Sequence, residues 1–147
     1  MDIISKYQNE PFLLSETAKI LRMEKHKPQV IAWIRRHVKP FIVDTSRPQR
    51  VFTKLDLINI FELYLIKTLS RYNVRLGFIG DVISRDQITE IIRSTKLDYI
   101  VISGVAAFIT AKPMEFLKRM GGMEAVIIID TMKIKNEIFA GIKRARG

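Results

Sequence analysis

The segment at residues 54–72 constrains the fold most, because a helix there would be apolar on nearly every side. Its apolar residues are Leu55, Leu57, Ile58, Ile60, Phe61, Leu63, Tyr64, Leu65, Ile66 and Leu69. A helix with so little polar surface must be buried on several sides. We therefore predict that Thr53 caps a central core helix at about 54–72. Part of this helix is also a candidate for a subunit interface.

Two shorter helices are expected before this core helix. Ser15 is a favourable N-cap for a first helix at about 16–22, which would bury Ala18 and Leu21. Ala18 either allows a close helix crossing or is simply a good helix former. The connection at 23–27 is basic, and Pro28 suits the first position of a second helix at about 28–37.

The second helix has one apolar side and one polar side. Its apolar stripe contains Val30, Trp33, Ile34 and Val38, at helical spacing. The opposite face contains Gln29, Ala32, Arg35 and Arg36. Arg can pair bidentately with guanine and Gln with adenine, so this face suits entry into a DNA major groove. The alternative is an ordinary solvated face.

A β-hairpin is expected after the second helix. Residues 41–43 and 50–52 are short β-prone runs, joined by the turn-rich sequence Asp-Thr-Ser-Arg-Pro-Gln. Arg47 and Arg50 would lie at or beside the tip, where they could reach phosphates or a minor groove. A hairpin in this place is typical of the wing of a winged helix-turn-helix.

The second half of the chain changes in character. Ser84 and Gln87 have the spacing of a capping box, which predicts a helix continuing to about Thr95. Residues 97–147 then read as a ββαβα module: strands at 99–102 and 105–109, a helix at 113–120, a strand at 125–129 and a last helix from Thr131. The predicted fold class is α+β. The predicted domains are a DNA-binding domain with core helices at 1–96 and a small dimerisation or partner-binding module at 97–147.

The charge of the chain points to a polyanionic partner. The 147 residues include 25 basic and 15 acidic ones, for a net charge of +10. Between Lys19 and Arg50 nine basic residues face only two acidic ones, so most of the excess lies in the predicted head. The chain has no cysteine, its N-terminus does not resemble a secretory signal, and its most apolar run is too short to span a bilayer. We expect a soluble cytoplasmic protein without a membrane partner.

Little in the sequence indicates catalysis. His26 and His37 lie outside any metal-binding spacing, and without cysteine a zinc site is not expected. Asp81, Asp86 and Glu90 could be carboxylates of a metal-dependent nuclease, but a solvent face paired with Arg85 and Arg93 is the simpler interpretation. Asp130, just after an apolar strand, is weak evidence of a site. We expect no enzyme activity, no cofactor and no bound metal.

The order of motifs resembles the MerR-like winged helix-turn-helix superfamily over about residues 12–83. Members have a Ser and an Ala three residues apart in the first helix, an aromatic late in the second, an aromatic closing the wing and an acidic residue opening the third helix. The corresponding residues here are Ser15, Ala18, Trp33, Phe52 and Asp56.

The chain departs from the MerR-like pattern at several points. The turn between the first two helices is about two residues longer, and Arg22 stands where glycine is common. No long heptad helix for an antiparallel coiled coil follows Asn73, and the effector-sensing cysteines of metal-responsive members are absent. The resemblance is closer to small prokaryotic proteins, antitoxins among them, in which a MerR-like head precedes a short tail.

These features predict a sequence-specific double-stranded DNA-binding protein, a transcriptional regulator that acts as a homodimer. The residues expected to contact DNA are Lys25, Lys27, Gln29, Arg35, Arg36, Arg47 and Arg50. One alternative is an antitoxin whose residues 97–147 mask a toxin partner. Another is an accessory protein or nuclease that uses the head to reach nucleic acid. A third is that the C-terminal module only dimerises the head.

Overall fold

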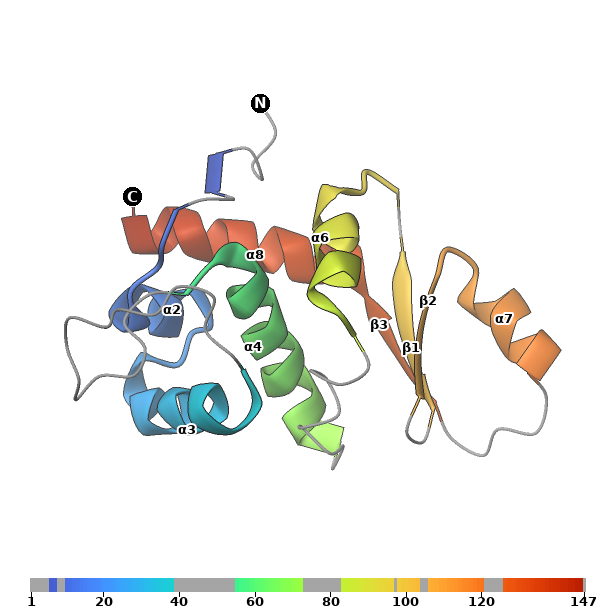
Figure 1. Ribbon diagram of the computed structural model, residues 1–147, viewed down its shortest axis with the longest axis horizontal. Helices are drawn as coiled ribbons and strands as arrows, with labels where there is room; N and C mark the ends of the chain where they lie inside the picture. The colour runs from blue at the N-terminus through green and yellow to red at the C-terminus, as the bar shows by residue number, and fades with distance from the viewer. Residues whose placement is uncertain are drawn as a thin grey trace.

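The computed structural model is an α+β fold, as the sequence predicts, with helices on both sides of a small antiparallel sheet (Figure 1). It describes residues 6–7, 10–38, 55–72, 83–96, 98–103, 106–120 and 126–146. None of the helices within these ranges has the length and apolar composition required to cross a bilayer.

The predicted core helix is α4, Leu57–Leu69, and it lies in the middle of the molecule (Figure 1). Its fully buried residues include Ile60, Leu63 and Ile66. The helix begins later than predicted, because Asp56 rather than Thr53 is the N-cap: one carboxylate oxygen of Asp56 accepts from the backbone N–H of Asn59 at 2.8 Å. The helix ends at Leu69, and a 3₁₀ turn, η2 at Ser70–Tyr72, follows.

The two shorter helices precede α4 in the chain. The first, α2 at Leu14–Ile20, begins before the predicted Ser15 cap; Leu13 is the N-cap, and its N–H donates to the Glu16 carboxylate at 3.1 Å. A 3₁₀ turn, η1 at Glu24–His26, leads into α3 at Lys27–His37. The predicted apolar stripe of the second helix is confirmed: the exposed fractions of Val30, Trp33, Ile34 and Val38 are 0%, 6%, 1% and 4%.

The sheet has the strand order β2-β1-β3 and is antiparallel throughout. Its strands are β1 at Tyr99–Ser103, β2 at Ala106–Thr110 and β3 at Ile127–Asp130. Ile100 lies opposite both Ile109 and Ile129, and directly opposed residues point to one face of the sheet. Ile100 and Ile129 on this face join the main core, while on the other face Phe108 contacts Phe116 of α7, Pro113–Met120.

The last helix, α8 at Thr131–Arg146, packs against both α2 and α4 (Figure 1). Its residues Ile134, Ile138 and Ile142 belong to the same hydrophobic core as α2, α3 and α4. Gly141 allows the close approach, since a Cβ there would lie 2.8 Å from the carbonyl oxygen of Ile20. The boundary predicted between residues 96 and 97 therefore does not divide the hydrophobic core.

The helix α6, Arg85–Arg93, has the predicted capping box: Ser84 Oγ accepts from the Gln87 N–H at 3.1 Å, and Gln87 Oε1 accepts from the Ser84 N–H at 2.9 Å. At the other end of α6, the buried amine of Lys135 donates to the carbonyl oxygens of Ile91 and Ser94 at 2.9 and 2.7 Å. A cation suits this position because a helix C-terminus carries partial negative charge. Lys135 thus links α8 to the C-terminal end of α6 through hydrogen bonds.

Candidate nucleic-acid interface

The connection that follows α2 has a defined geometry. The N–H of Met23 donates to the carbonyl of Ala18 at 2.8 Å, and the N–H of Arg22 donates to the carbonyl of Lys19 at 3.1 Å. This pair of bonds is a Schellman motif, whose turn residue adopts the left-handed conformation and is usually glycine. Arg22 occupies it with a φ of 55°. The position at which the MerR-like pattern favours glycine is therefore the left-handed residue of this turn.

The polar face predicted for the second helix is on the surface of α3. Its predicted contact residues Gln29, Arg35 and Arg36 are exposed, and so are Lys25 and Lys27 at its N-terminal end. In Figure 1, α3 lies at one end of the molecule and α7 at the other. Five of the seven predicted DNA-contact residues are thus accessible on one helix and the turn that leads into it.

Within the part of the chain that the structure describes, the cations around α3 take part in no ion pair. The ion pairs found among the described residues involve Arg85, Lys112 and Arg146, and none of the basic residues of η1 or α3. Glu24 is the one acidic residue between Lys19 and Val38. Unpaired exposed cations form a positive surface that can meet phosphates without first breaking an internal ion pair.

The predicted hairpin and its residues Arg47 and Arg50 lie outside the described residues. The described chain resumes at Leu55, which forms an antiparallel bridge with Phe12: the two backbone hydrogen bonds are 2.8 and 2.9 Å long. The chain that leaves α3 at Val38 therefore returns beside the start of α2. This bridge holds Leu55 beside the chain that enters α2.

A polar network lies under the start of α4. Arg85 contacts the carboxylates of Asp56 and Glu62, and Asn59 donates to Glu62 at 3.1 Å. Burial raises the pKa of Glu62, although the Asn59 hydrogen bond and the charge of Arg85 oppose this. Arg85 thus joins α6 to the start of α4.

The weaker candidates for catalysis have structural explanations or lie outside the described residues. Asp130 caps α8, because its carboxylate accepts from the N–H groups of Met132 and Lys133 at 2.9 and 3.3 Å. Asp86 and Glu90 are exposed on α6, while Asp81 lies outside the described residues. Within the part of the chain that the structure describes, no group of three or more His, Asp or Glu side chains is placed to hold a metal ion.

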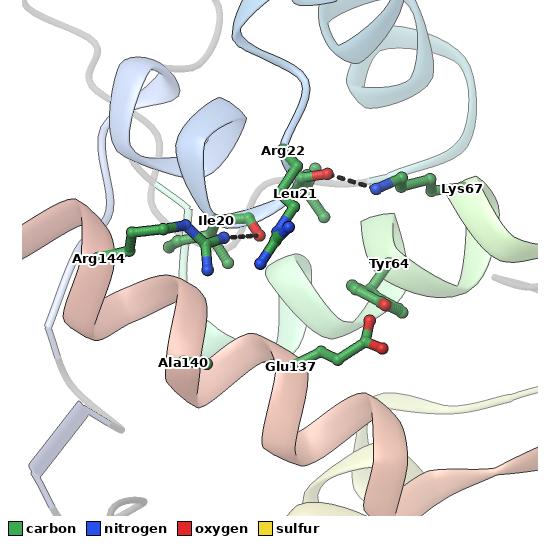
Figure 2. A pocket seen from close by; sticks show the side chains of 8 residues that line it. All are labelled: Ile20, Leu21, Arg22, Tyr64, Lys67, Glu137, Ala140 and Arg144. Carbon is green, nitrogen blue, oxygen red and sulfur yellow. Dashed lines mark hydrogen bonds between the residues drawn. The ribbon is translucent and has the colours of Figure 1, made fainter.

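A second basic cluster was not anticipated from the sequence. Arg22 from the turn after α2, Lys67 from α4 and Arg144 from α8 line one pocket (Figure 2). These residues are far apart in the chain, and no local motif connects them. The signal in the sequence was limited to Arg22, an arginine at a position that favours glycine.

Comparison with protein-family models, with curated proteins and with solved structures gave no match to the chain.

Proposed function

We propose that the protein is a sequence-specific duplex DNA-binding protein with a MerR-like winged helix-turn-helix head, acting as a homodimeric transcriptional regulator. In this proposal α2 and α3 are the two helices of the motif, and α3 enters the major groove. The predicted hairpin after α3 would be the wing.

The observation that carries the proposal is the division of α3 into a buried apolar stripe and an exposed face with Gln29, Arg35 and Arg36. The stripe anchors the helix against the core, so the helix is held rigidly while its polar face is left to solvent. Arg and Gln are the side chains that pair bidentately with guanine and adenine. Rigid presentation of such residues favours base reading over nonspecific attraction.

The surrounding cations support the same proposal through a different contact. Lys25 and Lys27 lie at the N-terminal end of α3, where they would meet the phosphates that flank the groove. Phosphate contacts set the position of a protein on the duplex, while base contacts select the sequence. The proposal therefore assigns base reading to Gln29, Arg35 and Arg36, and phosphate contact to Lys25 and Lys27, with Arg47 and Arg50 as further contacts.

The test is a selection of bound sequences from random duplexes with the full chain, followed by binding titrations of variants. Arg35→Ala should relax the base preference at one position of the site, by about 1–3 kcal/mol. Lys27→Ala should weaken binding to all sequences alike. Lys96→Ala, which removes an exposed cation far along the chain from α3, serves as the control and should change neither quantity.

Salt dependence tests the electrostatic part separately. If about six phosphate contacts form, affinity should fall roughly 10³-fold between 50 and 200 mM salt. Equal effects of Arg35→Ala and Lys27→Ala on every sequence would refute the assigned roles. A selection that returns no preferred sequence, together with a flat salt dependence, would refute the proposed function.

A further inference from the structure

A pocket of about 270 Å³ lies between the turn after α2, the helix α4 and the helix α8 (Figure 2). Its charged and polar walls are Arg22, Tyr64, Lys67, Glu137 and Arg144. The turn after α2, the helix α4 and the helix α8 each contribute one cation. Such convergence of like charges is unfavourable in a folded protein unless something opposes it.

Part of the opposing charge comes from the end of α2. Lys67 Nζ donates to the carbonyl oxygen of Leu21, and Arg144 Nη2 lies 3.3 Å and 3.5 Å from the carbonyl oxygens of Lys19 and Ile20. The two cations thus cap the C-terminus of α2, which carries at most about half a negative charge. Lysine has three donors and arginine five, so both side chains keep donors for another partner.

Arg22 is not explained by this capping. Its backbone holds the left-handed conformation, which few residues other than glycine adopt readily, and Figure 2 shows its side chain directed into the pocket. Within the described part of the chain, its guanidinium forms no hydrogen bond or ion pair. A strained residue that sends an unpaired cation into a pocket indicates a role in binding.

The charge of the pocket is not balanced from within. Three cations face one carboxylate, Glu137, and the end of α2, which leaves a surplus of roughly one and a half positive charges. The Lys67 amine reflects this crowding: burial lowers its pKa, and the guanidinium groups of Arg71, Arg22 and Arg144 lower it further. A bound anion would relieve this repulsion.

We propose that this pocket binds the phosphate group of a small molecule. The surplus charge matches a dianion, and the forked donors of Arg22 and Arg144 suit the oxygens of a phosphate. The Glu137 carboxylate and the Tyr64 hydroxyl are placed to hydrogen-bond a hydroxyl or amine on the same ligand. The volume fits a phosphate with a small organic group, near the lower end of known ligand pockets.

A phosphodiester of duplex DNA has similar chemistry, but Glu137 would repel a continuous line of phosphates. The proposal is independent of DNA binding, because it concerns a ligand that binds the protein alone. It is tested by isothermal titration of the full chain with inorganic pyrophosphate, without DNA, and by repeating the titration in a variant series.

The most informative variant is Arg22→Gly, which removes the cation while relieving the backbone strain. It should weaken pyrophosphate binding at least about tenfold, from one paired guanidinium, while the thermal unfolding midpoint stays equal or rises. Glu137→Gln removes the competing carboxylate and should tighten binding several-fold. Lys143→Gln, which removes an exposed cation of α8 outside the pocket, should leave binding within about twofold.

The proposal is overturned if pyrophosphate does not bind, or if Lys143→Gln weakens binding as much as Arg22→Gly, because the attraction would then be diffuse. It is also overturned if Arg22→Gly weakens binding to short duplex DNA but not to pyrophosphate. That result would assign the pocket to a DNA phosphate instead of a free ligand. Failure of the duplex selection alone would leave the pocket proposal standing.

Discussion

Three basic residues of α8 have surroundings opposite to those of Arg35 and Arg36 on α3. On α8, Lys135 caps α6, Arg144 caps α2, and Arg146 contacts the carboxylates of Glu10 and Glu16. On α3, Arg35 and Arg36 are exposed and take part in none of the ion pairs found among the described residues. The same residue types therefore hold segments of the fold together on α8 and are left exposed on α3. Net charge alone does not distinguish the two uses.

The largest effect is expected from truncation at residue 96, because it removes α8 and its contacts with the rest of the fold. Removing 97–147 takes away Ile134, Ile138 and Ile142, which are at most 3% exposed. At about 1.5–3 kcal/mol for each buried side chain, the loss approaches the whole stability of a typical domain, about 5–15 kcal/mol. The fragment 1–96 should lack a cooperative unfolding transition by circular dichroism. A fragment that melts cooperatively near the midpoint of the full chain would contradict a structural role for α8.

A substitution at Gly141 should test the packing of α8 against α2 within the intact chain. Helix propensity alone predicts that Gly141→Ala stabilises the protein by about 1 kcal/mol. The added Cβ would meet the carbonyl oxygen of Ile20 at 2.8 Å and its Cα at 3.0 Å, so we expect a net loss of about 1–3 kcal/mol in urea unfolding. The control is Ala140→Gly at the exposed neighbour, which should cost about 0.5–1 kcal/mol. A gain from Gly141→Ala would show that α2 and α8 are not in close contact.

The sequence predicts elements better than it predicts their partners. Periodicity located α4 and the stripe of Val30 and Ile34, and the local spacing of Ser84 and Gln87 located a helix start, because these signals lie within a few residues. It did not reveal that Arg85 pairs with Asp56, or that Lys67 and Arg144 converge on Arg22, since those contacts join segments from 29 to more than 120 residues apart. The predicted N-caps Ser15 and Thr53 were wrong, because Leu13 and Asp56 lie at the starts of these two helices instead.

The Arg146 contacts lead to a prediction about acid stability. Its guanidinium donates to Glu16 at 2.8 Å and to the carbonyl of Pro11 at 3.0 Å, and it lies 4.2 Å from the ring centre of Phe12. Arg146→Ala should therefore lower the free energy of unfolding by about 1–2 kcal/mol at neutral pH. Lys143→Ala, at an exposed neighbouring position, should stay within about 0.5 kcal/mol of the parent protein.

The effect of Arg146→Ala should diminish as the pH falls. Burial opposes ionisation of Glu16, but the hydrogen bond and charge of Arg146, together with the N–H of Leu13 and the charge of Lys19, outweigh it and hold the pKa of this carboxyl below its usual value. A lowered carboxyl pKa adds stability above the unfolded pKa of about 4.3, and this is lost as the pH falls through the folded pKa. The difference in unfolding free energy between parent and variant should shrink as Glu16 is protonated, leaving the part that comes from the Pro11 carbonyl and the Phe12 ring. A constant difference between parent and variant would show that Glu16 is not the partner that matters.

Arg22→Gly should produce a smaller change of opposite sign. The left-handed conformation costs an L-residue about 1–2 kcal/mol, while glycine loses about 0.5–1 kcal/mol through its greater freedom in the unfolded chain. We expect a net gain of about 0.5–1 kcal/mol in urea unfolding. Arg22→Ala retains the strained backbone and serves as the matched control. It should not raise the free energy of unfolding. Equal stabilities of the two variants would mean that the strain at φ 55° is not significant.

The smallest effect on stability is expected on α3 itself. Arg36 is exposed, and its described electrostatic contact is repulsive: burial lowers the pKa of His37, and the charge of Arg36 lowers it further. Arg36→Ala should leave the free energy of unfolding within about 0.5 kcal/mol of the parent value and raise the pKa of His37, followed by NMR titration. If Arg36→Ala destabilised the protein as much as Arg146→Ala, the stability of the fold would depend on the cations of α3 as much as on those of α8, and the contrast between the two helices would be wrong. A neutral effect on stability, together with a raised His37 pKa, would agree with the phosphate or base contact that we propose for this face of α3, because Arg36 would then have no role in holding the fold together.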